Sequence, residues 1–303
     1  MKSPSRPLNE IEQIMMTNKE KQPASQPPIT DKNLGFHNIT NPDPNKLSPD
    51  QIRFYNEKGY VKPFQIYDQT QADANREYFN FLLAGIKKQN DGRDSYAICG
   101  YHTQCRGIYD IITNPLILDH VEDLIGPDVV CWGTHFFCKL PHDPKAVSWH
   151  QDASFWPFDQ SRTVTVWLAI DDADVENACM HVIPGTHNLG PLEWEKPKDP
   201  GVLDQEITNV DQYGEPVPFE LKAGTMSMHA DMIVHGSAPN TSDRRRCGLT
   251  IRYIPAEVRS TAGWNKFGVI CRGRDDSGHW ANLPRPAVED LTPKPWQQEI
   301  KAG

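Results

Sequence analysis

The sequence predicts a mainly β protein, a sandwich or jelly roll, with flanking α-helices. From Val129 onward, short segments rich in β-branched and aromatic residues follow one another without a helical period. Turns rich in Gly and Pro separate them, and no helix alternates with them as a parallel sheet would require. We expect one domain over residues 46–303, with its core at about 129–256, after an extended leader over residues 1–45.

Three helices are expected before the main run of strands. The segment Ser48-Pro49-Asp50-Gln51 has the pattern of a capping box with proline in the first turn, so a helix over 50–58 should end at Gly59. A short strand at 60–64 follows. Further helices are expected at about 68–90 and 115–125. They contain few candidate catalytic groups, so we expect them to cover the outside of a sheet.

The remaining segments are strands, loops and a tail. The loop at 101–107 is dense in polar and aromatic groups, and it is either a segment that faces substrate or a solvated connection. An irregular insertion is expected at 190–218, and the tail from Thr261 is expected to wrap the outside. The expected strands are 129–139, 149–152, 163–170, 180–183, 225–228, 232–237 and 247–254.

Composition argues against several kinds of partner. The formal net charge of −9 argues against binding to a phosphate backbone. No apolar run approaches the roughly 18 residues of a membrane span, and the N-terminus lacks the apolar segment of a secretory signal. The seven cysteines form no CxxC pair, which indicates buried thiols in a reducing compartment. We therefore expect a cytoplasmic protein that binds neither nucleic acid nor membrane. We also expect a monomer or a homodimer.

A candidate metal site lies at Trp149-His150-Gln151-Asp152. On a strand, His150 and Asp152 point to the same face because side chains alternate. One imidazole and one carboxylate are two of the three ligands in the 2-His-1-carboxylate set that holds non-heme Fe(II). A surface or capping role is the alternative for such a short motif, so a second histidine must be found further along the chain.

His235 is the best candidate for that third ligand. It follows the apolar run at 232–234 and precedes Gly236-Ser237, which places it at a strand end inside the fold. His229 is expected to be a neighbouring or loop residue, His187 a turn histidine and His181 a core residue. Arg246 begins the next strand, and a planar guanidinium there suits the carboxylate of a 2-oxo acid.

These segments together resemble the phytanoyl-CoA dioxygenase family of Fe(II)/2-oxoglutarate oxygenases. The resemblance covers about residues 48–260 and includes the 149–152 motif, Val166–Ala173, Cys179–His187 and His235–Ser237 through Arg246. It implies a double-stranded β-helix, a cupin-like jelly roll. One turn departs from the family, because Ala178 stands where many members have Gly. Ala tolerates a left-handed backbone poorly, so we expect this turn to be built differently.

The resemblance implies that His150, Asp152 and His235 bind iron. Arg246 would bind the distal carboxylate of 2-oxoglutarate, Ser237 would support it, and Trp167 would line its pocket. The implied reaction uses O2, converts 2-oxoglutarate to succinate and hydroxylates a small-molecule metabolite or natural-product intermediate. Asp152 occupies the position that halogenating relatives leave open for halide, so halogenation is not expected.

The substrate is less well bounded. Candidate substrate residues are Arg106, Lys139, Phe155, Trp156 and Arg162, each with ordinary surface or packing roles as the alternative. An acyl-CoA or a phosphonate is another possible substrate, although the net charge disfavours CoA. A non-catalytic metal-binding jelly roll is the rival from a different class, and it would have no use for Arg246.

Overall fold

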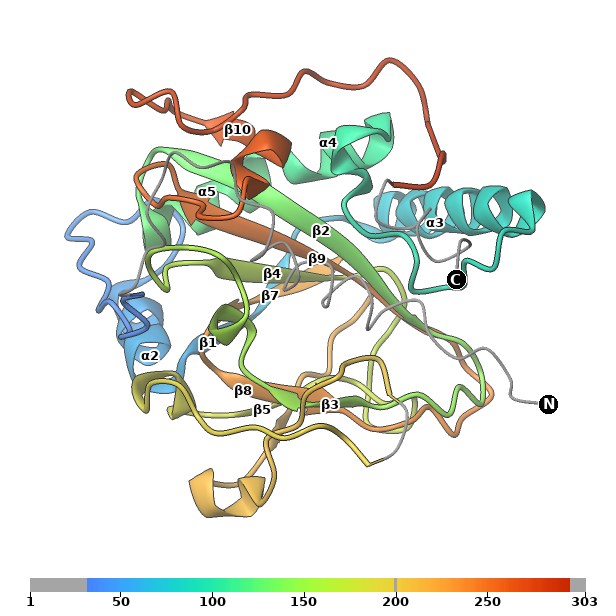
Figure 1. Ribbon diagram of the computed structural model, residues 1–303, viewed down its shortest axis with the longest axis horizontal. Helices are drawn as coiled ribbons and strands as arrows, with labels where there is room; N and C mark the ends of the chain where they lie inside the picture. Colours follow the sequence, from blue (N-terminus) through green and yellow to red (C-terminus); the bar gives the residue numbers. More distant parts are fainter. Residues whose placement is uncertain (1–31, 199–200, 295–303) are drawn as a thin grey trace.

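Two antiparallel β-sheets form the centre of the structure, a computed structural model that describes residues 32–198 and 201–294. The larger sheet has six strands in the order β1-β7-β4-β9-β2-β10, and the smaller has four in the order β3-β8-β5-β6 (Figure 1). This is the predicted double-stranded β-helix. The larger sheet contains β1 (Tyr60–Gln65), β2 (Val129–Lys139), β4 (Val164–Ala169), β7 (Thr225–Ala230), β9 (Arg246–Pro255) and β10 (Val269–Arg272). The smaller contains β3 (Val147–His150), β5 (His181–Ile183), β6 (Val217–Pro218) and β8 (Val234–Ser237).

The three central strands of the larger sheet divide their residues between two faces. On β9, Cys247, Leu249, Ile251 and Tyr253 belong to the main hydrophobic core, whereas the residues between them face the smaller sheet. Strands β4 and β7 alternate in the same way, because successive side chains of a strand point to opposite faces. One face of the larger sheet therefore builds the core, and the other is free to build a pocket.

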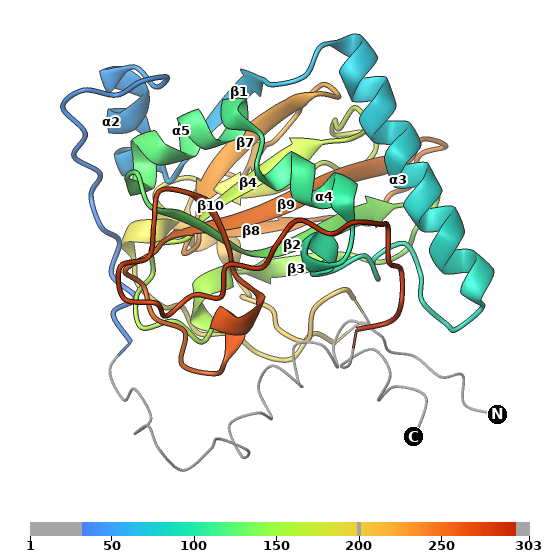
Figure 2. The ribbon, with the colours of Figure 1, turned by 90° about the horizontal axis from the view of Figure 1, so that it is seen from above.

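Helices cover the core face of the larger sheet. Figure 2 shows α3 (Gln69–Gln89), α4 (Arg106–Ile112) and α5 (Pro115–Ile125) lying across it. Their apolar residues Phe79, Ile112 and Val121 are fully buried in the main core. No helix in residues 32–198 and 201–294 is long and apolar enough to cross a bilayer.

The predicted helix starts are confirmed. Helix α2 (Pro49–Lys58) begins with a capping box between Ser48 and Gln51 and ends at Gly59 in the left-handed conformation. Within the predicted leader, residues 1–31 lie outside the described part of the chain. The Asp123 carboxylate accepts hydrogen bonds from the backbone N–H groups of residues 45–47, so this stretch lies against α5.

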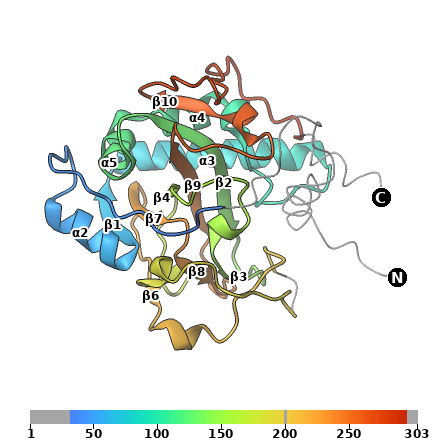
Figure 3. The same cartoon turned by 60° about the vertical axis from the view of Figure 1, so that its left-hand side comes forward.

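Three elements differ from expectation. Residues 101–107 form a short 3-10 turn followed by the start of α4, not an open loop. The tail supplies β10, which pairs with β2 at the edge of the larger sheet, and the insertion contributes the short strand β6 (Figure 3). The predicted strand at 149–152 ends at His150 in its ladder, and Asp152 starts a 3-10 turn.

Gly248 on β9 leaves room for Trp167, since a Cβ at this position would overlap the indole ring. We expect Gly248→Ala to lower the free energy of unfolding by about 1–3 kcal/mol through overpacking. Gly133 on β2 is the matched control, because a Cβ there would make an ordinary contact 3.7 Å from Arg252 Cδ. Urea unfolding of both variants checks this, and equal losses would contradict it.

Candidate metal centre and its pocket

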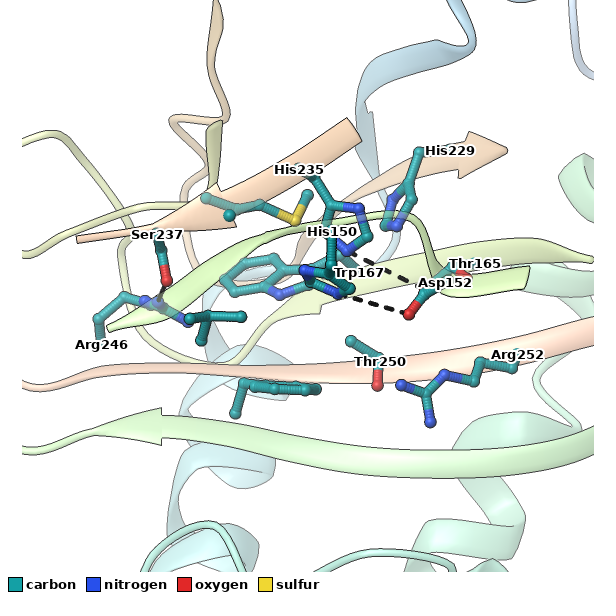
Figure 4. A pocket seen from close by; sticks show the side chains of 14 residues that line it. His150, Asp152, Thr165, Trp167, His229, His235, Ser237, Arg246, Thr250 and Arg252 are labelled. Atoms are coloured by element: carbon teal, nitrogen blue, oxygen red, sulfur yellow. Dashed lines mark hydrogen bonds and ion pairs between the residues drawn. The ribbon is translucent and has the colours of Figure 1, made fainter. Parts of the chain in front are cut away.

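Two histidines and one aspartate converge between the sheets. His150 ends β3 and lies directly opposite His235 on β8, with ring centroids 4.1 Å apart. Asp152 Oδ1 lies 3.5 Å from His150 Nε2, and its Oδ2 lies 4.0 Å from His235 Nε2 (Figure 4). One ligand atom from each residue lies within 4.8 Å of the others, and all three residues are buried. This donor set and spacing fit a single metal ion of the facial-triad type.

Gln151 holds the backbone between the two ligands on the first segment. It is buried and extended, with φ −117° and ψ 121°. Its side-chain amide donates to the carbonyls of Gly190 and Met232, and its oxygen accepts from Leu192 N–H. The extended backbone therefore continues past the end of β3, and His150 and Asp152 project to the same side as predicted.

Hydrogen bonds orient both imidazoles. His150 Nδ1 lies 2.8 Å from Ser148 O, and His235 Nδ1 lies 3.0 Å from Ile233 O. A carbonyl only accepts, so each Nδ1 carries the proton and each Nε2 presents a lone pair toward Asp152. Burial and the neighbouring His150 hold the pKa of His235 well below its ordinary value, which favours the neutral form that binds metals.

Asp152 stays ionised in this setting. Burial opposes its charge, but the neighbouring imidazoles of His150 and His235 and the charge of Arg252 outweigh that effect. Together they hold the pKa of the carboxyl well below its usual range. The site therefore offers an ionised carboxylate beside two imidazoles.

Arg246 lies at one end of the same pocket and is 2 % exposed. Its Nε donates to Ala178 O and its Nη2 to Ser237 Oγ, each at 3.0 Å, and its guanidinium lies 5.8 Å from the Trp167 ring centroid. No carboxylate among the described residues pairs with it. A buried cation without an anion is costly, so this end of the pocket is suited to an anionic ligand.

The turn at Ala178 supplies the carbonyl that accepts a hydrogen bond from Arg246. We expected this turn to avoid the left-handed conformation, but it does not. Ala178 has φ 62°, so it adopts the left-handed conformation that favours Gly. Asn177 Nδ2 donates to Asp172 O, and Asp174 and Asn177 exchange hydrogen bonds that close the loop. These bonds keep the turn in shape despite the Cβ.

The pocket opens to solvent, and its empty space of about 430 Å³ includes part of that solvent. Sequence reasoning placed His150, Asp152, Trp167, His235, Ser237 and Arg246 here, and all six line it. It missed several others, because only the strand register brings them to this face. These are Phe137, Val147, Thr165, Met180, Thr250 and Arg252. The two-residue alternation on the predicted strands was the available signal.

The structure places the predicted substrate residues away from the pocket lining. The Lys139 ammonium donates to the carbonyls of Lys145, Ser237 and Ala238, so it ties loops together beneath the site. Burial, aided by the charge of Arg246, lowers the pKa of Lys139 to about 6. Arg106 is exposed near Glu289, and Arg162 pairs with Glu257.

The two predicted aromatic residues have different surroundings. Phe155 makes an edge contact with Trp194, which is 47 % exposed. Trp156 packs on Trp132 with centroids 4.6 Å apart, and both rings contact the guanidinium of Arg252. Trp156 therefore does not line the pocket itself, but it contacts Arg252, which does.

The other histidines also differ in their roles. His229 lies within β7 and lines the pocket, and burial lowers its pKa to about 4. His187 is fully buried, with Nε2 at 3.0 Å from Asn56 O. His181 is half-buried, so it is not the core residue that was expected.

Comparisons with known proteins agree with this geometry. The family model for phytanoyl-CoA dioxygenase (PhyH) matches residues 55–248. A zebrafish (Danio rerio) phytanoyl-CoA dioxygenase domain-containing protein 1 is 30% identical over 226 residues, 72% of this chain and 70% of the relative. A probable alpha-ketoglutarate-dependent hypophosphite dioxygenase of Stutzerimonas stutzeri is 27% identical and aligns with 72% of this chain and 82% of its own.

A solved structure, the apo form of the non-heme monooxygenase ThoJ, matches with a TM-score of 0.70 and 26% identity. The match covers 82% of this chain and 97% of that one. The fold and the His-Asp-His site define an Fe(II)/2-oxoglutarate-dependent oxygenase. Within that class, the chain belongs to the phytanoyl-CoA dioxygenase family.

Ala178 is strained and should be improved by glycine. We expect Ala178→Gly to raise the free energy of unfolding by about 0.5–1 kcal/mol, since glycine adopts a positive φ without a Cβ clash. Ala173→Gly is the control, because Ala173 lies in a regular bridge with Leu221 and should lose stability. Urea unfolding measures both, and a loss for Ala178→Gly would contradict the strain.

Proposed function

We propose that this chain is a dioxygenase that uses Fe(II), 2-oxoglutarate and O2 to hydroxylate a small molecule. His150, Asp152 and His235 hold the iron. Arg246 binds the distal carboxylate of 2-oxoglutarate, Ser237 supports it, and Trp167 lines the co-substrate pocket. The observation that carries the proposal is Arg246, a buried guanidinium without a carboxylate partner among the described residues, in the same pocket as the triad.

When bound, the iron would supply the O2 chemistry. One oxygen atom of O2 enters succinate as 2-oxoglutarate loses CO2, and the other enters a substrate C–H bond. The protein's part is positioning. Arg246 retains N–H donors beyond the two that hold it, and a guanidinium binds a carboxylate through paired hydrogen bonds. The Trp167 ring limits where the rest of the co-substrate lies and helps to exclude water.

The substrate shares its pocket with 2-oxoglutarate, which supports a small substrate. The family name points to an acyl-CoA and one relative's name to hypophosphite. The net charge of −9 disfavours the phosphates of CoA, so we favour a small metabolite.

Neighbours with the same fold include a carbocyclase and an epimerase, so the fold alone does not choose hydroxylation. The triad's carboxylate argues against halogenation, because Asp152 would occupy a coordination position that a halide needs. The expected cytoplasmic location, the single domain at 46–303 and the monomeric or dimeric state also remain part of this proposal. A metal-binding jelly roll without activity is the rival, and it leaves Arg246 without a purpose.

Arg246→Gln should weaken 2-oxoglutarate binding by about 10–100-fold, since a charge-assisted carboxylate contact is lost. The affinity for Fe(II) should change by less than about twofold, because Arg246 contacts none of the three metal-binding side chains. Anaerobic calorimetry measures both. Arg245→Gln is the matched control, since the neighbouring guanidinium pairs with Asp171. Unchanged 2-oxoglutarate binding in Arg246→Gln, or none in the unaltered protein, would favour the inactive metal-binding alternative.

Asp152→Ala should lower Fe(II) affinity by about tenfold or more, because it removes the anionic ligand.

The unaltered protein, turned over in chloride with any accepted substrate, should give a product heavier by one oxygen and no chlorinated product. Mass spectrometry of the product checks the outcome. Chlorination by the unaltered protein would contradict the assignment of Asp152.

A further inference from the structure

Three polar side chains form a row across the pocket face of the larger sheet. Thr165 on β4 lies opposite His229 on β7 and also opposite Arg252 on β9. Directly paired residues of neighbouring strands share a face, so the three lie side by side across the sheet. All three line the pocket, and Figure 4 shows them on the Asp152 side of it. We call His229, Thr165 and Arg252 the polar row.

Every member of the polar row has polar atoms without a partner. Thr165 Oγ1, both ring nitrogens of His229 and Arg252 Nε are buried and make no hydrogen bond to the described residues. Buried polar groups are almost always satisfied, so several unsatisfied ones in contact with one pocket indicate a missing ligand. The residues that alternate with them along the same strands are mostly apolar core residues, which cannot supply hydrogen-bond partners.

Arg252 gives the row its charge. Its guanidinium lies 5.1 Å from the Trp156 ring centroid and 5.5 Å from that of Trp132. These rings hold the cation in place, but they do not use its N–H donors. No carboxylate of the described residues forms an ion pair with it. Asp152 feels its charge at longer range, and that carboxylate already faces the two histidines.

The polar row and Arg246 lie at opposite ends of one strand face. Arg246 and Arg252 both point into the pocket from β9, with roughly 20 Å between their Cα atoms at the usual rise of a strand. Figure 4 shows the triad between the two arginines. The triad adjoins the polar row, since the ring centroids of His229 and His235 lie 5.1 Å apart. A co-substrate carboxylate at Arg246 therefore leaves the polar row unoccupied.

We propose that the polar row binds an anionic group, a carboxylate or a phosphonate, on the substrate that the enzyme oxidises. The row would thereby select small organic anions. Arg252 provides the charge, and Thr165 and His229 donate hydrogen bonds to the same group. An anion held there places the neighbouring carbon atoms beside the triad. This inference rests on the proposed function and names the substrate class of that site.

The test uses matched probes on the protein loaded with Fe(II) and saturating 2-oxoglutarate under anaerobic conditions. Calorimetry measures the affinities of butyrate and propylphosphonate, with neutral butyramide as the uncharged counterpart. The unaltered protein should bind at least one anion about tenfold more tightly than the amide. Arg252→Gln should remove that preference, and Arg252→Lys should keep part of it.

Further measurements separate this role from a structural one. Affinities for Fe(II) and 2-oxoglutarate should change by less than about threefold in Arg252→Gln and in Thr165→Val. Arg274→Gln, which removes an exposed arginine paired with Asp276, is the control for net charge and should keep the preference.

Three results would overturn the proposal: no anion preference in the unaltered protein, a preference that survives in Arg252→Gln, or an equal loss of 2-oxoglutarate binding in that variant. The last would mean that the polar row serves the co-substrate. If the unaltered protein fails to bind 2-oxoglutarate at all, the proposed function itself fails, and the two failures are thereby distinguished.

Discussion

A buried guanidinium with no opposing carboxylate among the described residues is the constraint around which the pocket is built. Arg246 is held by one side-chain hydroxyl and one backbone carbonyl, from β8 and from the turn at Ala178. Neither contact neutralises its charge. Desolvating such a group is costly, so the fold gains most when an anion occupies this end of the pocket. Two features keep neighbours of Arg246 in position. The left-handed Ala178 presents its carbonyl to the guanidinium, and Gly248 leaves room for Trp167.

The two-residue alternation on β4, β7 and β9 connects this constraint to the rest of the fold. Residues on one face, such as Val166, Met228 and Ile251, pack under the helices. Residues between them form the pocket wall. The core and the site are therefore two faces of the same three strands, and a shift of one residue in register would exchange them.

Much of this arrangement is predictable from the sequence. Capping residues mark the ends of α2, and the triad follows from a short motif and a strand-end histidine. The polar row is different, because Thr165, His229 and Arg252 are far apart in the chain and only strand pairing joins them. Lys139 illustrates the opposite error. A lysine at a strand end reads as exposed and available, yet three backbone carbonyls hold it inside. Strand β10 was missed because a short apolar stretch in a Gly- and Arg-rich tail carries little strand signal.

The division of labour between the two sheets has a further consequence. Two imidazole ligands come from the smaller sheet, whereas both pocket arginines come from β9 of the larger one. Exchanges at 165, 229 and 252 can therefore retune what enters the pocket while the ligand-bearing strands stay untouched. Among homologous chains, the residue types at these three cross-strand positions should vary together, as a recognisable code for the charge of the compound that each enzyme accepts.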